Sequence, residues 1–190
     1  CIFVDHASGY INLQFQSVLT SHATLESKAN FESACCDVGV VPMKYIMDNA
    51  KYCTSKKFTA HMSEFRQIQA FAGVGAHQQN AIAERSIQTI TSISRAMMIH
   101  AALHWPEVAD SSLWPMAVKQ ATWLWNHMPN PSTGLSPSDI FTRSRYPLAK
   151  LHDVHVFGCP AYVLQKTLAD GKKLPRWKPR SAQCIYLGRA

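Results

Sequence analysis

The chain has 190 residues, of which 47% are hydrophobic and 16% are charged, and it carries a net charge of +7. This composition excludes a disordered chain and suits one well-buried domain with a small appendage. No apolar run approaches the roughly 20 residues of a membrane-spanning helix, so we expect no membrane partner.

The predicted elements begin with two short β-prone runs, residues 1–5 and 10–15, which the turn sequence HASG joins into a hairpin. This strand-like start predicts that the chain begins inside a domain. The run SHATLESKANFESACCDVG has helical spacing, and VVPMKYIMD predicts a strand that ends at Asp48. TSKKFTAHMSEFRQ then predicts a helix capped by Thr54 or Ser55, and IQAFAG predicts a short strand.

A long helix is predicted from Gln79 to about Ala102, because its apolar residues recur at intervals near 3.6. A further helix covers roughly Ser112–His127 and closes at MPNPSTG. Alternating strands and helices predict an α/β fold, with a sheet flanked by helices. The apolar stripe of the long helix consists of Ile82, Ile87, Ile90, Ile93 and Met97.

From about His152 the pattern changes to two β runs, VHVFGCPAYVLQ and SAQCIYLG, separated by a basic connector. These runs predict a small β module. Residues 143–190 carry ten Lys and Arg against two acids, whereas residues 1–142 carry nine against ten. Basic residues around Trp177 favour a polyanion partner, and a solvated basic tail is an equal alternative. The basic patch consists of Lys172, Lys173, Arg176, Lys178 and Arg180.

The six cysteines form no C-x-x-C pair, so we expect reduced thiols in an intracellular protein, in the nucleus or the cytoplasm. His100 and His104 lie four residues apart on a predicted helix and could hold a metal ion. No glutamate of an H-E-x-x-H motif accompanies them, which weighs against that site.

Two acids stand out by position. Asp48 ends the apolar strand, where a turn or helix-capping aspartate is the plain alternative. Glu84 lies on the first turns of the long helix, on the same polar face as Asn80 and Gln88. A strand-end aspartate and a helix glutamate can converge on Mg²⁺, which prefers oxygen ligands. A pair of such ions can assist in-line displacement at a phosphodiester, and holding both ordinarily takes a third carboxylate.

The sequence around these acids resembles a known family. MDNAKYCTSKKF and HQQNAIAERSIQTI, with 35 residues between the two acids, resemble the D-N-G and P-Q-Q-N-G-x-A-E-R segments of retroviral-type integrases. The ASGY hairpin is similar to one in that catalytic core. HDVHVFGCPAYV and KPRSAQCIYLG resemble the SH3-like module after the core in copia-type retrotransposon polyproteins.

The resemblance implies an α/β fold with an RNase H-like mixed sheet flanked by helices, followed by a small SH3-like β module. It implies a catalytic core over residues 1–105 that lacks its first strand, a helical extension over 106–150, and the basic β module over 151–190. It also implies DNA integration, with 3′-end processing and strand transfer that depend on Mg²⁺ or Mn²⁺. The implied partners are element and target DNA and further copies of the protein.

Residue by residue, the resemblance makes Asp48 and Glu84 the second and third metal-binding carboxylates. Asn80 and Gln88 match positions that contact DNA, where ordinary solvated amides are the alternative. The family's first aspartate lies on a strand before the hairpin. Asp5 is the acid nearest that strand, but the resemblance places it beside the hairpin turn and not on the catalytic strand.

The expected consequence is an N-terminally truncated fragment that is inactive alone, so its status as an enzyme is left open. The family pattern also changes at Ala50, His77 and Ala81, where the family has glycine or proline. Two alternatives stand beside integration. One is an RNase H-like nuclease that only hydrolyses, and the other is a non-enzymatic nucleic-acid-binding remnant of a decayed element.

Overall fold

The computed structural model describes residues 1–48, 50–51, 53–71, 81–107 and 109–189. Contacts divide the chain into two units. Unit 1 is Cys1–Ile90 with Leu124–Tyr146, and unit 2 is Thr91–Trp123 with Pro147–Ala190. The units follow packing rather than chain order, and the three-part division inferred from the sequence remains a prediction.

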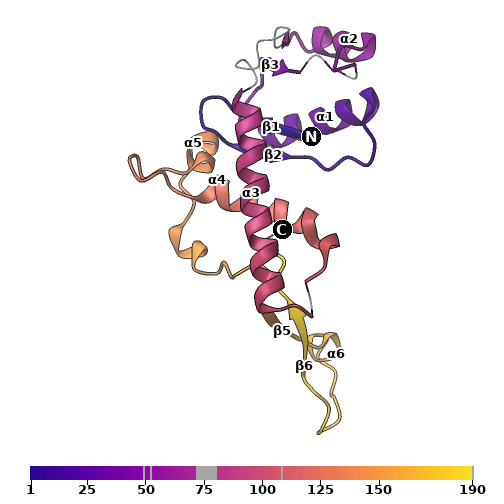
Figure 1. The fold of residues 1–190 in the computed structure, drawn as a ribbon, viewed down its shortest axis with the longest axis vertical. Helices are drawn as coiled ribbons and strands as arrows, with labels where there is room; N and C mark the ends of the chain where they lie inside the picture. The colour runs from indigo at the N-terminus through magenta and orange to yellow at the C-terminus, as the bar shows by residue number, and fades with distance from the viewer. Residues whose placement is uncertain (49, 52, 72–80, 108, 190) are drawn as a thin grey trace. The chain divides into compact units, whose positions relative to one another are not determined.

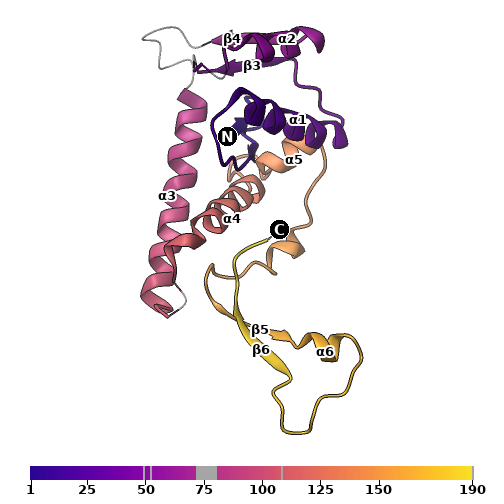
Figure 2. The same ribbon diagram turned by 90° about the vertical axis from the view of Figure 1, so that its right-hand side faces the viewer.

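Unit 1 contains two small sheets. Strand β1 (Ile2–Val4) pairs antiparallel with β2 (Ile11–Leu13), and β3 (Lys44–Met47) pairs parallel with β4 (Ile68–Phe71). Figure 1 shows the first pair beside helix α1, and Figure 2 shows the second pair beside α2. The predicted mixture of parallel and antiparallel strands is therefore present. Within the described residues it takes the form of separate two-stranded sheets.

The helices of unit 1 begin where the sequence places capping side chains. Helix α1 (Ser21–Asp37) follows Thr20, whose Oγ1 accepts a 3.2 Å hydrogen bond from the backbone N–H of Ala23. Helix α2 (Lys56–Glu64) follows Ser55, which decides between the two predicted caps. Helix α5 (Pro137–Thr142) begins with a reciprocal capping box that joins Ser136 and Asp139.

Aromatic stacking holds the core of unit 1 together. Phe31, Cys35 and Phe141 are buried there. The ring of Phe3 on β1 stacks on Phe31 of α1 at 4.6 Å between centroids. Tyr10 stacks on Phe141 of α5 at 4.3 Å. Each such pair adds about 1 kcal/mol beyond the burial of its surface. The hairpin is thereby fixed between α1 and α5.

The outer edge of β2 is covered by the last turns of α4 (Trp114–His127). The backbone N–H of Ile11 donates to Asn126 Oδ1 at 2.9 Å, and Asn126 Nδ2 donates back to the Ile11 carbonyl at 2.7 Å. Trp125 Nε1 donates to the carbonyl of Gly9 at 3.0 Å. The Asn126 amide thus satisfies the strand edge as a neighbouring strand would.

The long helix α3 (Ala81–His104) confirms the helix predicted from the isoleucine stripe. Gln79, the predicted first residue of that helix, lies outside the described residues. Burial along the stripe is uneven. Ile90 is 3% exposed, whereas Ile82 and Ile87 are 37% and 47% exposed. None of the helices in the described residues has the length and apolarity needed to cross a bilayer.

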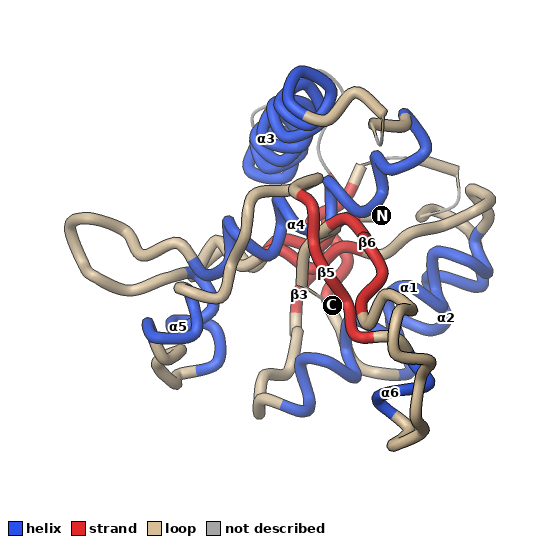
Figure 3. The backbone as a smooth tube through the Cα atoms, turned by 90° about the horizontal axis from the view of Figure 1, so that it is seen from below, coloured by secondary structure: helices blue, strands red, loops and turns tan. Residues whose placement is uncertain are grey.

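Unit 2 contains the antiparallel strands β5 (Pro160–Leu164) and β6 (Ser181–Ile185), seen as a red pair in Figure 3. The short helix α6 (Lys166–Ala169) lies between them in the chain. Of the predicted SH3-like module, the described residues contain this two-stranded sheet. Unit 2 also includes the one-turn 3-10 helices η2 (Ser111–Leu113) and η3 (Leu148–Leu151).

The core of unit 2 gathers around Ala101, Ala117 and Phe157, all of which are buried. Gly158 follows Phe157 with a φ of +82°, and a Cβ added at Gly158 would lie 2.7 Å from the Cβ of Ala101. Glycine is therefore required at position 158 for both backbone conformation and space.

Candidate catalytic site

Asp48 directly follows β3, and its side chain is exposed. The strand positions it by alternation, because Tyr45 and Met47 are partly buried while Lys44 and Ile46 are exposed. Burial raises the pKa of the nearby Cys53 thiol, and the negative charge of Asp48 raises it further. Asp48 thus lies close enough to Cys53 for its charge to act there.

Glu84 lies in the first turn of α3, and its side chain is exposed. A carboxylate at this end of a helix is favoured by the partial positive charge of the free N–H groups. Gln88 lies one turn further on and is also exposed. Asn80, predicted on the same face, lies outside the described residues.

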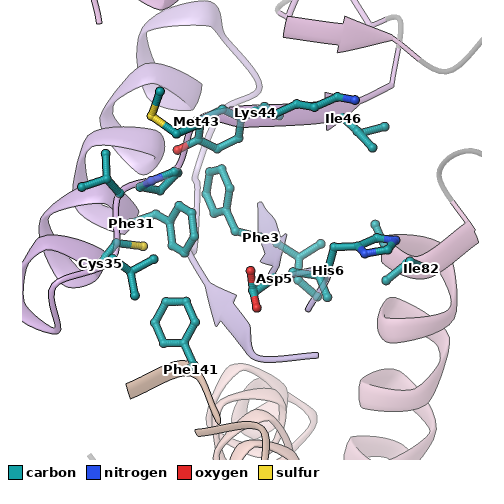
Figure 4. A pocket seen from close by; sticks show the side chains of 17 residues that line it. Phe3, Asp5, His6, Phe31, Cys35, Met43, Lys44, Ile46, Ile82 and Phe141 are labelled. Atoms are coloured by element: carbon teal, nitrogen blue, oxygen red, sulfur yellow. The ribbon is translucent and has the colours of Figure 1, made fainter. Parts of the chain in front are cut away.

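A cavity of about 620 Å³ in unit 1 is lined by residues that shortly precede both acids in the chain, while neither acid is among its lining residues. Ile46, two residues before Asp48, and Ile82, two residues before Glu84, both line it. Figure 4 shows these two side chains together with Phe3 and Asp5 of the hairpin. The end of β3 and the first turn of α3 therefore meet at one cavity.

Asp5 also lines this cavity, but its carboxylate is engaged in the hairpin turn. Asp5 Oδ2 accepts hydrogen bonds from the backbone N–H of Ser8 at 2.8 Å and from Ser8 Oγ at 2.6 Å. The backbone N–H of Asp5 donates to the carbonyl of Tyr10 at 2.8 Å. These bonds give Asp5 a structural role in closing the turn.

The donor set suits a hard cation only in part. Asp48 and Glu84 offer the carboxylate oxygens that Mg²⁺ prefers, and Mg²⁺ usually keeps several waters beside one or two carboxylates. Across the described ranges, no three His, Cys, Asp or Glu side chains are grouped so as to hold a metal ion. These two residues would have to hold an ion together with water or a further ligand.

A buried polar network behind β3 was not predicted from the sequence. Lys28 of α1 is fully buried, and its Nζ donates to both carboxylate oxygens of Glu32 at 2.8 and 2.9 Å. Glu32 also accepts hydrogen bonds from the Tyr45 hydroxyl, at 2.8 Å, and from Gln67 Nε2. The network ties α1 to β3 and to Gln67, the residue just before β4. The signal was present, since Lys28 falls on the buried stripe of its helix four residues before an acid.

The pKa of Glu32 reflects two opposing influences. Burial alone would raise the pKa of this carboxyl, but hydrogen bonds from Lys28, Gln67 and Tyr45 outweigh burial. The pKa of Glu32 therefore lies below its usual value. Burial, with the hydrogen bond to Glu32, raises the pKa of the Tyr45 hydroxyl, so this phenol stays protonated.

The basic patch lies in unit 2, on the connector between α6 and β6, and each of its side chains is exposed. Trp177, in the middle of the connector, is 94% exposed. A fully exposed indole among cations has no structural role in the described residues. The members of the patch are Lys172, Lys173, Arg176, Lys178 and Arg180.

No protein-family model matches the sequence. Over 146 residues, or 74% of the chain, it is 30% identical to the retrovirus-related Pol polyprotein from transposon TNT 1-94 of Nicotiana tabacum. The chain spans 10% of that relative's length.

The fold is similar to solved integrase structures. The catalytic core domain of HTLV-2 integrase, in complex with magnesium in its dimeric form, matches with a TM-score of 0.52 and 18% identity, over 74% of this chain and 81% of that one. The simian T-cell lymphotropic virus intasome in complex with PP2A regulatory subunit B56 gamma matches with a TM-score of 0.58 and 14% identity, over 95% of this chain and 58% of that one. The sequence is thus similar to a retrovirus-related Pol polyprotein, and the fold is that of retroviral integrase catalytic cores.

Proposed function

We propose that this chain supplies two of the metal-binding carboxylates, Asp48 and Glu84, of an integrase that joins element DNA to target DNA. One observation carries the proposal: in a chain with the integrase-core fold, Ile46, two residues before Asp48, and Ile82, two residues before Glu84, line one cavity. Spacing and chemistry agree with it, since 35 residues separate two hard oxygen donors.

In this proposal Asp48 and Glu84 hold Mg²⁺ or Mn²⁺, which would neutralise charge on the reacting phosphate when bound. Gln88 and Asn80, four residues on either side of Glu84 in the sequence, contact the DNA and orient it. In end processing a water oxygen attacks phosphorus, and in strand transfer a DNA 3′-oxygen does so. The 3′-oxygen on the opposite side then leaves with the bonding electrons.

We propose further that the 190-residue chain does not catalyse alone, because two carboxylates hold a metal pair poorly. Activity then requires a third carboxylate and the assembly of several copies on DNA. The solved structures with a similar fold include the HTLV-2 integrase catalytic core domain with magnesium, in a dimeric and a trimeric form. They also include an intasome of simian T-cell lymphotropic virus. The same proposal places the protein in the nucleus or the cytoplasm.

The basic patch is the proposed non-specific DNA contact. Its exposed cations suit backbone phosphates, and binding would release condensed counterions. The exposed indole of Trp177 lies among them and suits stacking on an unpaired base.

Metal binding tests the carboxylate assignment without requiring activity. We expect weak, saturable Mn²⁺ binding by the purified chain in electron paramagnetic resonance titrations. Asp48→Asn and Glu84→Gln should each weaken it about tenfold or more. Glu64→Gln, which alters an exposed acid on α2, is the matched control and should leave binding unchanged. Equal binding by all four proteins would refute the assignment.

An activity assay separates the alternatives. With Mg²⁺ or Mn²⁺ and element-end DNA, we expect neither 3′-processing nor strand transfer from the chain alone. Robust activity that Asp5→Asn abolishes would show that the chain is complete and that Asp5 is catalytic. Hydrolysis without joining would identify an RNase H-like nuclease instead.

A further inference from the structure

Two histidines lie side by side at the end of helix α3. His100 and His104 are both exposed, and their rings stack with 4.0 Å between centroids and 17° between planes. The spacing explains the contact, because residues four apart lie on the same face of a helix. Both histidines belong to unit 2, whereas Asp48 and Glu84 belong to unit 1.

One hydrogen bond fixes the tautomer of His104. Its Nδ1 lies 2.9 Å from the carbonyl oxygen of His100. A carbonyl oxygen only accepts hydrogen bonds, so Nδ1 carries the proton and donates it. In the neutral ring Nε2 is then the nitrogen with the lone pair. Histidines that bind metal ions commonly donate their other ring N–H to a backbone carbonyl in this way.

The position on the helix also suits a cation. His104 is the last residue of α3, where the backbone carbonyls of the final turn carry a partial negative charge. The ring of Trp105 lies 5.7 Å from that of His100 and 5.8 Å from that of His104, between centroids. Trp105 packs against the buried core around Ala101. The turn that carries the two imidazoles is therefore anchored in the core of unit 2.

The donor atoms define which ion fits. Imidazole nitrogens suit Zn²⁺, Cu²⁺ and Ni²⁺, whereas Mg²⁺ and Mn²⁺ prefer oxygen ligands. In the part of the chain that the structure describes, no third His, Cys, Asp or Glu is grouped with the pair, so water would complete the coordination shell. The residues between the two histidines are Ala101, Ala102 and Leu103. The missing glutamate of an H-E-x-x-H motif removes a general base but leaves both ligands in place.

We propose that His100 and His104 form a two-histidine site that binds Zn²⁺ or another transition-metal ion with a preference for imidazole. A metal ion lies in the plane of each ring, so the stacked rings turn about χ2 on binding, and this torsion is broad in histidine. The ion then links residues one turn apart and stabilises the end of α3. This site is independent of Asp48 and Glu84, whose carboxylates suit harder ions.

Pulsed electron paramagnetic resonance tests the site directly by counting the imidazoles bound to copper. The probe is the Cu²⁺ complex of iminodiacetate, which leaves coordination positions open for imidazole. In every protein compared, the exposed thiols of Cys1, Cys36 and Cys184 are replaced by serine, because thiolates also bind copper. We expect two imidazoles per copper. His100→Gln and His104→Gln should each weaken binding by about tenfold or more, because the second ligand acts intramolecularly.

Matched controls separate the pair from histidine content alone. The double variant Ala102→His with His104→Gln keeps two exposed histidines on this turn but spaces them two residues apart, where side chains do not face each other. It should bind as weakly as His104→Gln does. His22→Gln, which alters an exposed histidine on α1, should bind as the parent protein does. Excess Mg²⁺ should not displace the copper complex. Zn²⁺ should raise the melting temperature of the parent protein more than that of His104→Gln.

Several outcomes would overturn the proposal. These are fewer than two imidazoles per copper in the parent protein, equal affinity in the parent and His104→Gln, and two imidazoles in the variant with shifted spacing. A two-imidazole signal that depends on protein concentration at full copper occupancy would assign the ion to two copies of the chain and would also refute it. Failure of Mn²⁺ to bind at Asp48 and Glu84 would leave this proposal unaffected.

Discussion

Lys28 illustrates how one buried charge sets the local chemistry. Its side chain is 1% exposed, and its ion pair with Glu32 is closed by hydrogen bonds from Tyr45 and Gln67 to the same carboxylate. Removing one partner of a buried pair leaves the other charged and unpaired, which costs far more than the pair itself contributes. The network therefore supports the strand that leads to Asp48.

Glu32→Gln should destabilise the protein at neutral pH by about 3 kcal/mol, because it leaves the Lys28 ammonium buried without a counter-charge. Urea denaturation would measure the loss. The double variant Lys28→Met with Glu32→Gln is the control, and it should recover much of the lost stability. An unchanged free energy of unfolding for the single variant would contradict this account of the pair.

The pH dependence follows from the lowered pKa of Glu32. A carboxyl whose pKa is lower in the folded protein stabilises the fold above its unfolded pKa, which is about 4.3. This stabilisation is lost as the pH falls through the lower, folded pKa. The stability difference between wild type and Glu32→Gln should therefore shrink below about pH 4. A constant difference down to pH 2 would argue against a lowered pKa.

At the scale of single residues, spacing and the resemblance single out Asp48 and Glu84, and their role as metal ligands stays a prediction. Helical spacing pairs Glu32 with Lys28, but the sequence did not reveal that Tyr45 and Gln67 also donate to Glu32, because these residues are distant from it in the chain. Such contacts arise only when helices and strands pack, and periodicity describes one element at a time.

At the scale of elements, Asn126 joins α4 to a strand edge 115 residues away in the chain. Asn126→Ala should cost about 2 to 3 kcal/mol, because both backbone groups of the buried Ile11 would lose their partner. Met128→Ala, which shortens a side chain that is 62% exposed, is a suitable control and should cost little. Thermal unfolding of the two variants would check this, and similar losses would show that Asn126 is not a specific clamp.

Helix positions were the most predictable elements, because capping side chains and apolar spacing are local signals. Ser55 and the start of α2 are an example. The pairing of strands was less predictable, since it depends on partners from distant segments. In place of one mixed sheet, unit 1 has an antiparallel pair, β1 with β2, and a parallel pair, β3 with β4, among its described residues. Ile82 and Ile87 are exposed, which shows that apolar periodicity alone does not ensure burial.

At the scale of the whole molecule, the net positive charge is concentrated in residues 143–190. This concentration predicts a salt-sensitive interaction with DNA. Affinity for a duplex of arbitrary sequence should fall steeply between dilute and physiological salt. Replacing Lys172 and Lys173 with alanine should reduce the slope of log affinity against log salt by about 2. Fluorescence anisotropy would measure the slope, and a flat salt response would remove this assignment.

Lys56 and Lys57 provide the matched control, because they are also adjacent, exposed lysines but lie on α2 outside the basic segment. Their replacement with alanine should leave the slope unchanged. An equal reduction in both pairs would mean that net charge, rather than the basic patch, governs binding.

The close approach of Gly158 to Ala101 limits how this protein can diverge. Since a Cβ at position 158 would lie 2.7 Å from the Cβ of Ala101, position 158 cannot gain a side chain while Ala101 keeps its place. Descendants of this sequence should therefore retain glycine at position 158, because even a smaller residue at position 101 would leave the φ of +82° that favours glycine. A collection of natural variants would then show glycine kept at position 158, 57 residues after position 101 in the chain, whatever else the lineage changes.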